Sequence, residues 1–386
     1  MNLSKSILYT VLSVSILTVP VVSGCSNKAA SSGEQKKETS SKDNELKSQV
    51  KEMEASLENL QNSLQDKNES KVKEYGKRLN KQWLTYENNI REKYPLLYTD
   101  TEKYLLPLYA EVTKDKLNSS KVQQLSVDLS RSFKNLRNAK ESTQKTNKVL
   151  DSAVKKYQKY VNEQTGELVK STKSFTDAVR ANNTPKAKEA YAEARVYYER
   201  IEPIAESFGD LDPKIDAREN DVDGEWTGFH RIEKALWKDG SLKGMTRYAN
   251  QLDQDVAELQ EKIEKVKLNP TQIVAGSMEL LNEAAISKVT GEEERYSHID
   301  LVDLNSNVEG SQAVYHAVLP VLNEKNKDLA QDLDTEFNKI TVLLNEHKNS
   351  GAYLNYEKLK KSQVRELSQQ LNTLSESMAQ TAEIFQ

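Results

Sequence analysis

Apolar residues recur at helical spacing along most of the chain. In the first clear run they are separated by alternating steps of four and three, at Leu46, Val50, Met53, Leu57, Leu60 and Leu64. This narrow seam is typical of a coiled coil or an extended helical hairpin. The helical period continues from Tyr75 to about Leu150. The pattern predicts an N-terminal helical region in which these residues serve packing.

The second half of the chain shows the same period with wider apolar faces. Helices are predicted at about 184–208, 226–237, 252–266, 273–289, 329–344 and 364–378, and Pro320 is predicted to end another that begins near Leu304. Only 13 Gly and 8 Pro occur in 386 residues, too few turn-forming residues for a many-stranded sheet protein. We therefore predict an all-α fold of long-helix bundles, with two four-helix-type bundles in the C-terminal part.

The first residues indicate an exported protein. Lys5 precedes an apolar run from Ile7 to Val22, which is short for a transmembrane helix and typical of a signal peptide. It ends in Val22-Ser23-Gly24-Cys25, which resembles the bacterial lipobox. Cys25 is the single cysteine, so a thioether to a lipid explains it better than a free thiol. We predict a lipoprotein signal peptide at 1–24 and a lipid anchor at Cys25, on the outer face of the cell membrane.

Composition divides the remainder of the chain. Residues 26–44 have almost no apolar side chains, and we predict a flexible tether at 25–44. An N-terminal helical region is predicted at 45–150 and a second helical domain at 151–386. The formal charge of -4 argues against nucleic acid as a partner. No histidine precedes position 230, so the first half lacks the ligands of a cupredoxin-type copper site.

One short segment has the residue types of a metal site. His230 and Glu233 are three positions apart on a predicted helix and therefore share a face. Glu199 and Glu202 have the same spacing one helix earlier, beside residues predicted to be buried. A surface His-Glu pair, or pairing of the glutamates with Arg195 or Arg200, remains the alternative interpretation.

A third acidic segment is a weaker candidate. It contains Glu292, Glu293, Glu294, His298, Asp300 and Asp303 near a predicted helix start. Acidic residues also favour helix N-termini for electrostatic reasons, so capping competes with a metal role here. Glu309 is likewise a weaker candidate for a metal ligand, whereas His316 and His347 are isolated from other candidate ligands in the sequence.

These segments together resemble a known family. The runs YAEARVYYERIEPIAESFGDLDPKIDAR, GEWTGFHRIEKALW and GEEERYSHIDLVDLNSNVEG are similar to imelysin-like proteins, and most closely to EfeO/EfeM-type lipoproteins of bacterial iron uptake. The resemblance implies two helical bundles with a metal site in the cleft between them. Its implied metal-binding residues are Glu199, Glu202, Asp216, His230 and Glu233. It also implies delivery of iron to an inner-membrane permease, with a haem peroxidase as a further component of the system.

Carboxylates with an imidazole form a hard, oxygen-rich site that suits iron or manganese, and zinc also fits. The leading hypothesis is a metal-capture lipoprotein without enzymatic turnover. The alternative is a zinc-dependent peptidase, although neither H-E-x-x-H nor H-x-x-E-H is present. A coiled-coil envelope protein with an incidental metal site is the third hypothesis.

Overall fold

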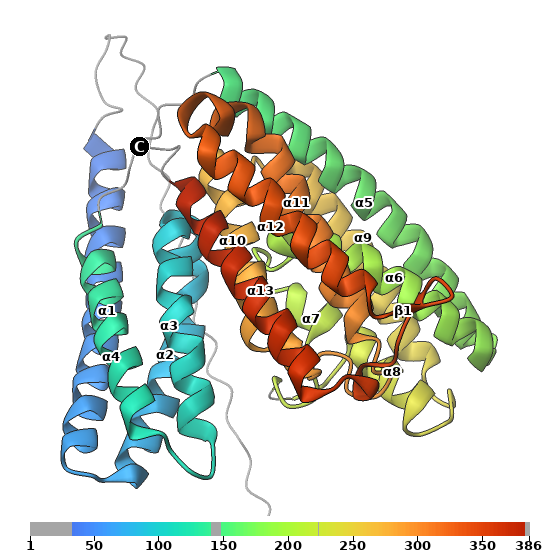
Figure 1. Ribbon diagram of the computed structural model, residues 1–386, viewed down its shortest axis with the longest axis horizontal. Coiled ribbons are helices and arrows are strands. Elements are labelled where there is room, and N and C mark those ends of the chain that lie inside the picture. Colours follow the sequence, from blue (N-terminus) through green and yellow to red (C-terminus); the bar gives the residue numbers. More distant parts are fainter. Residues whose placement is uncertain (1–32, 140–147, 223, 383–386) are drawn as a thin grey trace, which may run out of the picture. The chain divides into compact units, whose positions relative to one another are not determined.

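The computed structural model describes residues 33–139, 148–222 and 224–382, and it is helical almost throughout (Figure 1). This confirms the predicted all-α fold. In the described part of the chain, the strands β1 (Lys348–Asn349) and β2 (Ala352–Tyr353) form one small antiparallel pair. The described residues divide after Glu45 into two compact units.

Four helices form the N-terminal region. They are α1 (Gly33–Gln65), α2 (Glu69–Lys93), α3 (Pro95–Thr113) and α4 (Ser119–Arg137). From Leu46 onward their apolar faces build a core of their own, to which the seam from Leu46 to Leu60 belongs. Asn68 and Asn118 cap α2 and α4, each accepting a hydrogen bond from a backbone N–H of the first turn. The predicted seam is therefore a packing surface within a helical bundle.

The predicted signal peptide and Cys25 lie outside the described residues. Helix α1 begins at Gly33, so residues 33–44 are helical where we predicted a flexible tether. Low apolar content was the basis of that prediction, but this segment is rich in Glu, Lys and Gln, which have high intrinsic helix propensity. Within the described ranges, no helix combines the length and apolar character needed to cross a membrane.

The remaining helices share a second, larger core. They are α5 (Lys148–Arg180), α6 (Thr184–Ala205), α7 (Asp212–Asp216), α8 (Gly228–Trp237), α9 (Thr246–Lys265), α10 (Pro270–Ile286), α11 (Asp300–Lys325), α12 (Lys327–Asn345) and α13 (Lys361–Gln380), with short 3₁₀ turns at η1 (Lys288–Thr290) and η2 (Tyr356–Lys358). Helix α6 packs along α5 and α11, and α10 packs along α13. Together with α10, the neighbouring helices α5 and α11 bury most of the length of α6.

Two local features shape the surroundings of α6. A Cβ at Gly310 would lie 2.5 Å from the carbonyl oxygen of Arg200, so glycine permits the close approach of α11 to α6. Helix α11 also continues through Pro320 to Lys325, although we predicted that Pro320 would end it. Val321 and Leu322 beyond the proline are buried in the core, and this packing offsets the lost backbone hydrogen bond.

Candidate metal site

Helix α6 contributes a row of buried polar residues to the centre of the larger core. Tyr191, Arg195, Glu199 and Glu202 lie on one face, because each is three or four positions from the next. All four are at most 5% exposed. Buried ionised side chains are costly unless opposite charges and hydrogen bonds compensate them. The partners of this row come from α7, α8, η1, α11 and the segment that leads into α11.

The turn between α7 and α8 brings the carboxylate of Asp216 toward α6. Gly228 begins α8 with a φ of 85°, and a Cβ at this position would lie 2.2 Å from the carbonyl oxygen of Ile215. Only glycine tolerates both the positive φ and this contact. The side chains of Trp226 and Thr227 donate hydrogen bonds to the carbonyl oxygens of Ala217 and Lys214. These contacts hold the end of α7, and therefore Asp216, beside the start of α8.

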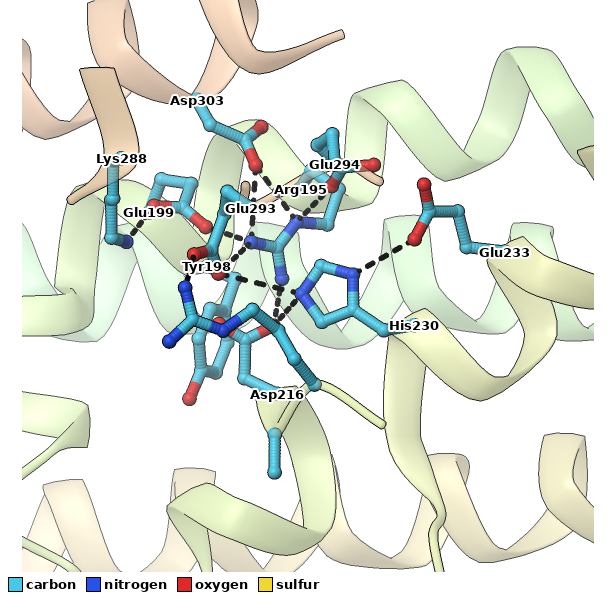
Figure 2. Close-up of polar contacts among 12 residues, drawn as sticks. Arg195, Tyr198, Glu199, Asp216, His230, Glu233, Lys288, Glu293, Glu294 and Asp303 are labelled. Atoms are coloured by element: carbon cyan, nitrogen blue, oxygen red, sulfur yellow. Dashed lines mark hydrogen bonds and ion pairs between the residues drawn. The ribbon is translucent and has the colours of Figure 1, made fainter. Parts of the chain in front are cut away.

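His230 is held by one ring nitrogen and points the other into the site (Figure 2). Its Nδ1 lies 3.0 Å from Oε2 of Glu233. The other oxygen of Glu233 accepts hydrogen bonds from the backbone N–H groups of Tyr296 and Ser297, at 2.9 and 2.7 Å. Glu233 is thus fixed by three contacts, and it orients the imidazole as carboxylates do behind metal-binding histidines.

The second ring nitrogen of His230 faces two carboxylates. Nε2 lies 3.5 Å from Oδ1 of Asp216 and 3.4 Å from Oε1 of Glu293. It is buried and has no hydrogen-bond partner among the described residues. The three ligand-type atoms lie within 4.8 Å of one another. We call Asp216, His230 and Glu293 the His230 group.

The charges around the His230 group shift its pKa values. Burial alone would lower the pKa of His230, but the carboxylates of Glu233 and Glu293 outweigh it and raise the pKa to about 10. Burial raises the pKa of Asp216 to about 7. A metal ion that binds Nε2 therefore has to replace a proton on the imidazole.

Three cations lie among the acidic residues, and one of them is Arg218, whose NH1 atom lies 3.4 Å from Oε2 of Glu293. Arg195 contacts Glu199, Asp216, Glu293, Glu294 and Asp303, and Figure 2 shows its guanidinium between them. Nζ of Lys288 lies 2.9 Å from Glu199 and 2.5 Å from Glu202. Both glutamates also accept hydrogen bonds from the Asn307 amide. The alternative interpretation in which Arg195 pairs with these glutamates therefore has a structural basis at Glu199.

The residues predicted for the site thus fall into two sets. Asp216 and His230 lie together, with Glu233 directly behind the imidazole, whereas Glu199 and Glu202 face Lys288. The role of all five residues as metal ligands stays a prediction. Of the weaker candidates, Glu292 is exposed, His298 lies 3.7 Å from Glu357, and Glu309 pairs with Arg200 at 2.7 Å.

Glu293 was assigned to the weaker acidic segment, yet it faces His230. Its position follows from the irregular segment between η1 and α11, which has no helical period and therefore gave no orientation. Its neighbour Glu294 accepts hydrogen bonds from Tyr191 and Ser297. The run of three acids was the available signal because of its high local charge, and two of the three, Glu293 and Glu294, are buried.

Two further sets of side chains lie equally close together among the described residues: one shares His230 and adds Glu233 and Glu294, and the other consists of carboxylates alone. Glu202, Glu206 and Glu283 also have ligand-type atoms within 4.8 Å of one another. We call them the Glu206 group. It has no imidazole, and Glu202 is already bonded to Lys288 and Asn307.

The sequence profile of the imelysin family matches residues 153–381, more than half of the chain, and this stretch includes the whole site. The chain belongs to the imelysin family. This confirms the resemblance found in its motifs. The chain is 48% identical over 367 residues to the iron uptake system component EfeM of Bacillus subtilis (strain 168), covering 94% of this chain and 95% of the relative. It is 43% identical over 242 residues to an Efem/EfeO family lipoprotein of Staphylococcus aureus (strain NCTC 8325), covering 61% of this chain and 85% of the relative.

Proposed function

We propose that this protein captures iron outside the cytoplasmic membrane, as a lipid-anchored component of an iron uptake system, and passes the metal on without chemical turnover. The observation that carries the proposal is the buried Nε2 atom of His230, which has no hydrogen-bond partner in the described structure and faces two carboxylate oxygens from different segments. Asp216, His230 and Glu293 would hold the ion, and Glu233 would orient the imidazole.

The ligand atoms of the His230 group suit iron. Two carboxylates and one imidazole form a hard site, which favours iron or manganese over metals that prefer thiolates. The three residues come from α7, α8 and the segment before α11, so they can enclose an ion only in the folded protein. The similarity to EfeM, a protein named for iron uptake, favours iron as the cargo.

The setting of Glu233 favours capture over peptide hydrolysis. A zinc peptidase needs a carboxylate that accepts a proton from the metal-bound water. Burial alone would raise the pKa of Glu233, but the hydrogen bond to His230 and two backbone N–H groups lower it. A carboxylate with a lowered pKa and occupied oxygens is a weak base, so Glu233 suits the orienting role.

The cellular setting follows from the start of the chain and from the relatives. Val22-Ser23-Gly24-Cys25 matches a lipobox, and a relative of this chain is named a lipoprotein. We place the anchor at Cys25 and the folded domains on the outer side of the membrane. A membrane permease and a haem peroxidase of the same uptake system are the proposed partners. Replacing Cys25 with Ser should release the protein from membranes, and an unmodified thiol on the wild-type protein would contradict the anchor.

The metal assignment is tested by exposing the purified full-length protein to an equimolar mixture of iron, manganese and zinc salts, followed by metal analysis of the protein. We expect iron to be retained stoichiometrically and Asp216→Asn to lose it. Asp210→Asn is the matched control, because Asp210 pairs with Lys262 on the surface. Retention of zinc together with cleavage of added peptides would support the peptidase hypothesis instead.

A further inference from the structure

Arg195 contacts the same atoms that would bind the metal. Its NH1 atom bonds Oδ1 of Asp216, and its NH2 atom lies 3.8 Å from Oε1 of Glu293. These two oxygens are the ones that face Nε2 of His230. A guanidinium and a metal ion therefore compete for two of the three ligand atoms.

The side chain of Arg195 is completely buried. Burial disfavours the ionised form of each surrounding carboxylate, and neighbouring negative charges disfavour it further. A permanently charged guanidinium reduces both costs, because arginine stays protonated in proteins. Arg195 thus supplies part of the positive charge that a bound metal would bring to Asp216 and Glu293.

The surroundings of Arg195 also provide a place for it once the metal is bound. Its Nε lies 3.0 Å from Glu294, and its NH2 atom lies 3.1 Å from Asp303 and bonds Glu199. The guanidinium carbon lies 5.5 Å from the ring centre of Tyr198, within cation-π range. If Arg195 gave up Asp216 and Glu293, three carboxylates and an aromatic ring would still stabilise its charge. Displacement therefore leaves no unpaired buried cation.

We propose that Arg195 is a resident counter-ion which incoming iron displaces from Asp216 and Glu293, so that the site binds iron reversibly. This rests on the proposed function, because it assumes that the His230 group binds the metal. When iron leaves, Arg195 returns to the two vacated oxygens and compensates their charge. The exchange lowers the affinity and speeds release, which suits a protein that passes its cargo on.

Lys288 provides a matched control for Arg195. It carries the same charge and is also buried among carboxylates, at 1% exposure. Its Nζ atom bonds Glu199 and Glu202 instead of the oxygens that face His230. A variant of Lys288 therefore removes a nearby charge without removing a competitor for the ligand atoms.

The experiment measures iron affinity and release to a chelator for full-length wild-type, Arg195→Met and Lys288→Met proteins, with Fe³⁺ from its nitrilotriacetate complex and, without oxygen, with Fe²⁺. We expect Arg195→Met to bind iron at least about tenfold more tightly, as removal of a close charge competitor permits, and to release it more slowly. Lys288→Met should show a clearly smaller gain. Equal gains in the two variants, or weaker binding by folded Arg195→Met, would overturn the displacement proposal.

A second variant covers the case in which Arg195→Met does not fold, as judged by circular dichroism. Arg195→Lys keeps the charge but replaces the planar fork by a single ammonium group, which cannot reach all the carboxylates at once. Tighter iron binding by Arg195→Lys supports displacement, and unchanged or weaker binding overturns it. Failure of the wild-type protein to bind either form of iron would instead refute the proposed function.

Discussion

The His230 group and the Glu206 group both bring three side chains of metal-binding type within 4.8 Å of one another, but they differ in how their charge is compensated. Glu202 bonds Lys288 and Asn307, and Glu206 lies 3.8 Å from Arg91. Burial first, and neighbouring carboxylates second, raise the pKa values of Glu202 and Glu206 well above their usual range. Protons and neighbouring cations therefore compensate the charge of Glu202 and Glu206.

In the His230 group, the distinguishing feature is an imidazole fixed from behind. Glu233 occupies one ring nitrogen and leaves the other facing Asp216 and Glu293. Both groups contain a buried polar atom without a hydrogen-bond partner, Nε2 of His230 in one and Oε2 of Glu206 in the other. The difference is therefore the imidazole, which Glu233 holds in one orientation toward two carboxylates.

The largest expected effect separates the two groups directly. His230→Ala removes the only nitrogen donor of the His230 group and should weaken iron binding by at least about 100-fold, the upper range for loss of a supporting partner. Glu283→Gln in the Glu206 group should change the affinity by less than about twofold. Calorimetric titration of both variants measures this difference. His316→Ala is the control for loss of a histidine, because His316 is exposed and lies outside both groups.

A smaller effect tests the orienting role of Glu233. In Glu233→Gln the remaining oxygen can still accept the hydrogen bonds from Tyr296 and Ser297, but the new amide group opposes the N–H of the imidazole. The ring should lose its fixed orientation, and iron affinity should fall by about 10-fold to 100-fold. Titration with iron measures the loss. Unchanged affinity in a folded variant would mean that His230 is not oriented by Glu233.

The smallest expected effect is on stability, and it tests whether the pKa of Glu206 is raised in the folded protein. Because the pKa of Glu206 is raised in the folded protein, the unfolded chain loses this proton at lower pH, and stability falls as pH rises above the ordinary glutamate pKa. Glu206→Gln should therefore stabilise the protein at pH 8 by about 1 kcal/mol, within the range for a buried polar group with incomplete hydrogen bonding. Urea unfolding at pH 8 and pH 4 should show a gain only at the higher pH. A gain of the same size at both values would contradict the raised pKa.

The sequence predicted the helices well but only part of the metal site. The repeat of apolar residues predicted the helices because a buried stripe at helical spacing is a local property. The three-residue spacing placed His230 and Glu233 on one face for the same reason. The sequence placed Asp216 only in the loop between the two helices, from which it could reach the site, and the family resemblance implied it as a ligand; its place beside His230 depends on the contact between Gly228 and Ile215.

Other parts of the site depend on tertiary contacts that no local pattern encodes. Glu293 lies in an irregular segment, and its direction is set by the packing of η1 and α11. Lys288 resembles an ordinary exposed lysine in the sequence, yet it is buried against Glu199 and Glu202. The continuation of α11 past Pro320 has the same origin, because core packing beyond the proline outweighs its local effect.

The position of the metal can be located by diffraction measured at the iron absorption edge on crystals of the iron-loaded full-length protein. We expect one anomalous peak between Oδ1 of Asp216, Nε2 of His230 and Oε1 of Glu293, with the Arg195 guanidinium moved toward Glu294 and Asp303. A peak in the Glu206 group, with the His230 group lacking iron, would contradict this expectation.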